Sequence, residues 1–154
     1  MRRWFASSLP RALRIVRMPG PDRRLLIEAT FWLGFARACV LALPYRHVIS
    51  LFSLEDRAYG SMPSAEQHRT IAHVLWAVTT ASRHTPWASN CLARAIAGKV
   101  MLRRRQVAST LYLGLRKETE ALVAHAWLDH GRSNPLGDEG RSDYTIVWSS
   151  GEEG

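Results

Sequence analysis

The segment Pro86-Trp87-Ala88-Ser89-Asn90-Cys91-Leu92 leads from a loop into a helix and puts a cysteine at the helix start. Ser89 or Asn90 is a suitable N-cap, which places Cys91 in the first turn. Leu, Ala and Ile dominate the turns that follow, with Arg94 as the charged exception. We therefore expect a helix over about residues 91–105 that is buried on most sides.

Helical spacing dominates the chain before this segment. Apolar side chains recur at helical intervals between Leu25 and Leu43, and Pro44 ends that run. A short helix is expected over residues 45–53 and a loop over residues 54–63. Ser64 and Gln67 have the spacing of a capping box, which marks the start of another helix. Its core stripe is formed by Ile71, Val74, Leu75 and Val78.

Strand patterns take over in the last part of the chain. Leu111, Leu113 and Leu115 alternate with smaller or polar residues, which indicates a strand. Two further strands are expected over residues 122–129 and 144–148, the latter rich in residues that favour pleated surfaces. Because helices come first and strands last, the predicted class is α+β, with a helical N-terminal half packed on a small C-terminal antiparallel sheet.

Composition is that of one soluble globular domain without a cofactor motif. Hydrophobic residues make up 47% and charged residues 22% of 154 residues. The two cysteines lie in unrelated contexts and no signal peptide is apparent, which favours the reducing cytoplasm, with Cys39 as buried packing. No metal-ligand spacing occurs, because His68 and His73 lie on different helix faces, and no glycine-rich phosphate loop is present. We expect neither a metal nor another cofactor.

Charged residues are unevenly distributed along the chain, with a basic N-terminal end and an acidic C-terminal end. Residues 1–24 carry a net charge of +6 and residues 129–154 a net charge of −4. Such asymmetry is typical of an interaction surface, and nucleic acid, anionic lipid and an acidic peptide all remain open as partners. We expect a basic segment over residues 1–21, a domain over residues 22–148 and a flexible tail over residues 149–154.

The longest apolar run, residues 25–43, raises the question of a membrane span. Glu28 and Arg37 interrupt the run, and each charge would be costly at membrane depth. A helix that is buried or lies on a surface, with peripheral membrane contact at most, is therefore expected in place of a span.

Cys91 and His125 together indicate nucleophilic chemistry. A helix start favours the ionised form of a thiol, and its backbone N–H groups can stabilise a developing oxyanion. His125 lies within an expected strand and shares a face with Val123 and Trp127, so Trp127 could shield the pair from water. Each residue also has a purely structural interpretation: Cys91 as a small buried side chain, His125 as a hydrogen-bonded core histidine.

A histidine base needs a third group that orients its imidazole. Asp129 lies on the same strand as His125, about 13 Å away, which is too far for a hydrogen bond. Asp138 follows in a Gly-Asp-Glu-Gly turn, where the chain can double back beside the strand. We prefer Asp138, then Asn134, then Asp143.

The order of these motifs resembles the transglutaminase-like leader peptidases of lasso-peptide biosynthesis, also called lasso B proteins. The resemblance covers roughly residues 20–148 and includes the cysteine segment described above. It also rests on the Leu102-Arg103-Arg104-Arg105 helix end, Leu113-Gly114-Leu115 and Ala124-His125-Ala126-Trp127-Leu128. Gln106 departs from the family, because a glycine is expected to close the helix there and tolerates a left-handed backbone better.

The resemblance implies a papain-like cysteine protease core with a Cys-His-Asp triad. By position, Cys91 is the nucleophile, His125 the base and Asp138 the orienting acid. The family removes the leader from a ribosomally made precursor peptide, and a separate cyclase then closes the ring. Because the chain begins close to the protease region, the resemblance implies a separate PqqD-like protein that delivers the leader, and no nucleic-acid partner.

Two other functions remain open at this stage. An acyltransferase of the transglutaminase type would use the same triad and pass the acyl group to an amine instead of water. A non-catalytic basic adaptor would bind a membrane or nucleic acid and would not depend on Cys91.

Overall fold

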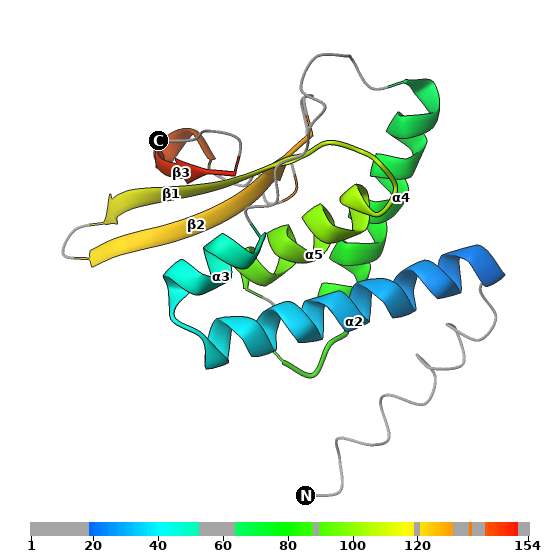
Figure 1. The fold of residues 1–154 in the computed structure, drawn as a ribbon, viewed down its shortest axis with the longest axis horizontal. Helices are drawn as coiled ribbons and strands as arrows, with labels where there is room; N and C mark the ends of the chain where they lie inside the picture. The colour runs from blue at the N-terminus through cyan, green and yellow to red at the C-terminus, as the bar shows by residue number, and fades with distance from the viewer. Residues whose placement is uncertain are drawn as a thin grey trace, which may run out of the picture.

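Helix α5 (Cys91–Arg103) lies at the centre of the fold, between a layer of helices and a small sheet (Figure 1). The computed structural model describes residues 19–52, 64–87, 90–118, 121–130, 136 and 141–150. Helices α2 (Gly20–Ala42) and α4 (Ala65–Ser82) pack against α5 from one side, and strands β1 and β2 pack from the other. The predicted α+β class, with a helical N-terminal half on a C-terminal antiparallel sheet, is confirmed.

The helices begin and end where local signals put them. Ser64 and Gln67 form the complete capping box before α4, each side chain bonding the other's backbone N–H at 3.2 and 2.8 Å. Helix α2 starts at Gly20, earlier than the apolar run, because Pro21 is tolerated in a first turn. Helix α3 (Tyr45–Phe52) follows directly after Pro44. The expected loop over residues 54–63 and the basic segment before residue 19 lie outside the described residues.

Helix α5 ends in a tight bonded turn. The Val107 N–H bonds the Leu102 carbonyl at 3.0 Å, and the Gln106 N–H bonds the Arg103 carbonyl at 2.9 Å, which is the Schellman pattern. This pattern needs a left-handed residue, and Gln106 has a φ of 57°. The departure noted in the sequence therefore falls on a backbone position that favours glycine.

The sheet places its first strand in the middle. Strand β1 (Thr110–Glu118) pairs antiparallel with β2 (Ala121–Asp129) on one edge and with β3 (Thr145–Ser149) on the other. A bulge in the β1–β3 pairing falls between Leu113 and Gly114. All three predicted strands are present, and β3 ends at Ser149, one residue past the domain boundary expected from the sequence. A short 3₁₀ helix (Arg141–Asp143) leads into β3.

The two faces of the sheet have different roles. Leu111 and Leu113 of β1, with Ala126 and Leu128 of β2, belong to the same buried cluster as the side chains of α5. Gly98 lets helix and sheet approach closely, because a Cβ there would lie 3.0 Å from Leu128 Cδ2. Since side chains alternate along a strand, the residues between these point to the opposite face of the sheet.

Lys99 of α5 forms hydrogen bonds beside the start of β1 and the end of β3. The side chain is 2% exposed, and its Nζ donates to the Ser109 carbonyl at 2.8 Å and to Ser150 Oγ at 3.1 Å. The same Ser150 hydroxyl accepts from the Leu111 N–H at 2.9 Å. A buried ammonium is tolerated because polar oxygens surround it, so the start of β1 and the end of β3 are held on the helix.

Helix α2 buries one face only. Leu26, Ala29, Leu33 and Ala36 are its buried side chains, and they join the core cluster. Among the described residues this helix is long and apolar enough to cross a membrane, and 22% of the stretch that meets this criterion is buried. The expectation of a helix with a packed face agrees with this placement, while its other face is exposed.

Candidate active site

Cys91 is the first residue of α5, as the sequence predicts. The Asn90 side chain caps the helix by accepting from the Ala93 N–H at 2.9 Å. The cysteine is half-buried and its thiol is not in a disulfide. First-turn N–H groups have no acceptor within the helix, so the backbone beside Cys91 can donate to a developing oxyanion.

The loop before Cys91 is held against α2. A Cβ on Gly34 would lie 3.2 Å from Trp87 Cζ2, so the indole sits directly on the helix at a position without a side chain. Thr85 Oγ1 donates to the Trp87 carbonyl at 3.2 Å, which fixes the turn that precedes α5. The nucleophile candidate therefore follows a loop that is anchored on α2 through Trp87.

His125 lies on β2 among aromatic side chains. It sits opposite Gly114 of β1. Its ring stacks on Trp127, with centroids 6.0 Å apart, and tilts against Tyr144, with centroids 5.1 Å apart. Trp127 is buried and also stacks on Tyr112. The expectation that His125 and Trp127 share a face of β2 is confirmed, and these rings restrict how the imidazole can turn.

Gly114 provides the room for this stack. A Cβ at Gly114 would lie 2.8 Å from Tyr144 Cβ and 2.9 Å from Trp127 Cζ3, distances that real Cβ atoms essentially never show. The position opposite His125 therefore has to be glycine. An isolated glycine within an alternating strand is a known sign of close approach, so the sequence carried a signal for this residue.

Arg116 connects the aromatic cluster to Asp143. Its guanidinium lies 5.0 Å from the Tyr144 ring centroid and pairs with Asp143 at 3.4 Å and Glu118 at 3.1 Å. The Asp143 carboxylate is exposed, and its partners are Arg116 and Ser142. Asp143, the third choice for the orienting acid, thus pairs with Arg116. Sequence reasoning missed Tyr144, because the β1–β3 pairing brings it beside His125, and it missed Arg116, which lies over the Tyr144 ring.

The first and second choices for the orienting group, Asp138 and Asn134, lie outside the described residues. Leu136, between them in sequence, is described: it forms a backbone bridge with Leu128, bonded at 3.1 and 3.0 Å in the two directions. Leu136 is two residues from Asp138, and Leu128 is three residues from His125. At Leu136 the chain therefore pairs with β2 three residues along the strand from the histidine.

The structure brings the elements that carry Cys91 and His125 into contact. Helix α5 packs on the face of β2 that carries Ala126 and Leu128, and His125 lies on the alternate face with Trp127. Within the described residues, Cys91 Sγ makes no hydrogen bond, including none to His125. Hydrogen bonds between a nucleophile and its base are often long without substrate and tighten in the bound complex.

The described residues contain no group of three or more His, Cys, Asp or Glu side chains that could hold a metal ion. At Cys91 and His125 the side chains offer a thiol and an imidazole, and the start of α5 offers backbone donors. These groups suit acyl transfer through a thioester.

Comparison with known protein families matches residues 33–149 to the transglutaminase-like superfamily. The match covers more than half of the chain and includes α5 and all three strands. The chain therefore belongs to the transglutaminase-like superfamily, which includes cysteine proteases and acyltransferases. Neither the curated proteins nor the solved structures gave a match.

Proposed function

We propose that this chain is a cysteine peptidase that removes the leader from a ribosomally made lasso-peptide precursor. One observation carries the proposal: in a transglutaminase-like domain, Cys91 starts a capped helix that packs against the strand carrying His125. The finer specificity, for a leader peptide, rests on the resemblance of the ordered motifs around these two residues.

The reaction we propose begins with the thiol. His125 takes the Cys91 proton as the sulfur attacks the carbonyl carbon at the leader–core junction, which forms a C–S bond and an oxyanion. The N–H groups at the start of α5 stabilise that oxyanion. His125 then gives its proton to the departing core amine, and the C–N bond breaks to leave a thioester.

Hydrolysis completes the cycle. His125 removes a proton from water as the oxygen attacks the thioester, the C–S bond breaks to release the leader as a free acid, and the imidazolium returns the proton to the Cys91 sulfur. In this proposal Asp138 holds the imidazole in the required tautomer. Trp127 and Tyr144 both contact the imidazole ring and restrict its rotation.

Two partners belong to the proposal. A separate PqqD-like protein presents the leader, and a cyclase takes up the freed core. We place the reaction in the cytoplasm, where both thiols stay reduced. Cleavage of the precursor should therefore be much faster when the recognition protein is present.

The nucleophile is tested by Cys91→Ala, with Cys39→Ala as the matched control. Both cysteines are half-buried and free, but Cys39 lies on α2. We expect Cys91→Ala to lower the rate of precursor cleavage by at least about 10³-fold, as loss of a covalent nucleophile does, and Cys39→Ala to change it little. Cleavage is measured by mass spectrometry and folding by circular dichroism. A folded Cys91→Ala variant that still cleaves would falsify the proposal.

The base and the orienting acid are tested by the same assay. His125→Ala should abolish cleavage, whereas His84→Ala, an exposed helix-end histidine, should not. Asp138→Ala should lower turnover far more than Asn134→Ala or Asp143→Ala. The reverse order would assign the orienting role to another residue.

The rival acyl transfer to an amine leaves a different product. Incubation with precursor and an excess of a primary amine distinguishes the two reactions, because water yields a free acid and an amine yields a crosslinked amide. We expect the free acid. A dominant amide would mean that the chain is an acyltransferase.

A further inference from the structure

The outward face of α2 is apolar and uncovered. Ile27 and Phe31 are each 61% exposed and Phe35 is 47% exposed, and their spacing of four residues puts them on one stripe. Leu41 extends the stripe toward the C-terminal end of the helix, and Leu51 of α3 is exposed nearby in the chain. A large exposed apolar patch on a soluble protein usually marks a contact surface.

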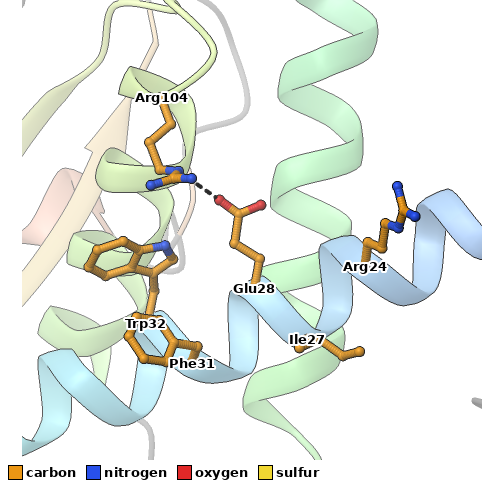
Figure 2. A pocket seen from close by; sticks show the side chains of 6 residues that line it. All are labelled: Arg24, Ile27, Glu28, Phe31, Trp32 and Arg104. Carbon is orange, nitrogen blue, oxygen red and sulfur yellow. Dashed lines mark ion pairs between the residues drawn. The ribbon is translucent and has the colours of Figure 1, made fainter.

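The charges on α2 leave this stripe uninterrupted. Glu28 is the one acid beyond the first turn, and it turns toward the end of α5, where it pairs with Arg105 at 2.6 Å and with Arg104 at 3.2 Å. Figure 2 shows Glu28 directed at Arg104, while the side chains of Ile27 and Phe31 stay exposed to solvent. The negative charge of Glu28 is thus balanced by ion pairs within the chain, so it does not repel an anionic partner.

Cations border the stripe instead. Arg23 and Arg24 are exposed at its N-terminal end, and Arg104, 62% exposed, lies beside the hollow formed with Phe31 and Trp32. The sequence before α2 continues this charge, because residues 1–18 contain five arginines and no acid. An apolar stripe edged by arginines matches a surface that is anionic at its boundary and apolar below it.

We infer that α2 docks this protein on an anionic membrane surface, with Ile27, Phe31 and Phe35 entering the interface and the arginines contacting lipid headgroups. The helix lies along the membrane and does not cross it, because its opposite face is part of the core with α4 and α5. Self-association through this face is disfavoured, since it brings two sets of arginines together. This inference goes beyond the proposed function and does not depend on Cys91.

The test is sedimentation of the full chain with vesicles. One set of vesicles is phosphatidylcholine with about 30% anionic phosphatidylglycerol. The other set is phosphatidylcholine alone. We expect at least about tenfold stronger binding to the anionic vesicles, and release when the salt concentration is raised well above the physiological range. Equal binding to both vesicles, or no binding to either, would overturn the inference.

The stripe is tested by the double variant Phe31→Ser/Phe35→Ser. Its matched control is Ile146→Ser/Val147→Ser on β3, where the side chains are 52% and 56% exposed. We expect the α2 variant to bind at least about tenfold more weakly and the β3 variant to bind like the unchanged chain, both with unchanged circular dichroism. Unchanged binding by the α2 variant would mean that residues 1–18 bind alone, which contradicts the role of α2.

Two further measurements separate the rival occupants of this face. Size-exclusion chromatography with light scattering should give a monomer, and a dimer that the α2 variant dissociates would identify a second copy as the occupant. Vesicle binding that resists both high salt and alkaline washing would indicate a spanning helix. If polyglutamate displaces the unchanged chain from vesicles, and the α2 variant binds polyglutamate as strongly as the unchanged chain does, the partner would be an acidic protein. Each of these results overturns the membrane inference, and Cys91→Ala should bind vesicles normally whether or not cleavage is lost.

Discussion

Gln106 is a residue whose side chain conflicts with its backbone. Its φ of 57° lies in the left-handed region, where a Cβ crowds the following carbonyl oxygen. The conformation persists because the turn bonds two carbonyls at the end of α5 and because Val107 and Leu102, which it brings together, are both buried. The hydrogen bonds and buried contacts of the turn thus outweigh the steric strain at Gln106.

Replacing Gln106 with glycine should relieve that strain. We expect Gln106→Gly to raise the free energy of unfolding by about 0.5–1 kcal/mol, because glycine adopts this conformation without a steric penalty. Gln106→Ala is the matched control and should give no such gain, since alanine keeps the Cβ. Urea denaturation measures both, and a gain with alanine equal to that with glycine would show that the backbone conformation is not the cause.

Gly114 carries the opposite constraint, a lack of space. We expect Gly114→Ala to lower the free energy of unfolding by about 1–3 kcal/mol, because the added methyl would overlap Tyr144 and Trp127. The displaced rings would also move His125, so precursor cleavage should fall more than stability alone explains. Gly20→Ala, where a Cβ meets nothing within 4 Å, is the control. Full cleavage activity in a folded Gly114→Ala variant would argue against the aromatic support of His125.

At the scale of elements, Lys99 couples α5 to the strand ends. We expect Lys99→Met to lower the free energy of unfolding by about 1–3 kcal/mol, because the Ser109 carbonyl and the Ser150 hydroxyl lose a buried donor. Lys117→Met, on an exposed part of β1, should change stability by less than about 0.5 kcal/mol. Thermal unfolding followed by circular dichroism compares the two. Equal stability of the two variants would mean that the Lys99 contacts contribute little.

Elements with local signals were predictable from the sequence. Ser64 and Gln67 interact over three residues, so their capping box could be predicted before α4 was seen. The alternation of Leu111 and Leu113 likewise gave β1 directly. The start of α2 was less accessible, because Pro21 reads as a breaker in sequence but is accommodated in a first turn.

At the scale of the whole molecule, contacts between distant residues could not be predicted. Lys99 and Ser150 are 51 residues apart, and no local pattern announces their hydrogen bond. The same holds for Tyr144 against His125, which depends on β3 pairing with β1 and not with β2. Cys91 and His125 were identifiable by residue type and context, but the distance between their side chains depends on how α5 lies on the sheet. Asp138 stays a prediction.

The central position of β1 also has a consequence for how the chain folds during synthesis. Strands β1 and β2 are neighbours in the chain and can pair before β3 is made, whereas β3 is made last and pairs with the other edge of β1. Until it docks, a nascent chain presents the unpaired backbone of β1, with Tyr112 and Leu113, to its neighbours. Such an open edge recruits strands from other copies, so slower translation of the residues between β2 and β3 should favour aggregates over soluble protein.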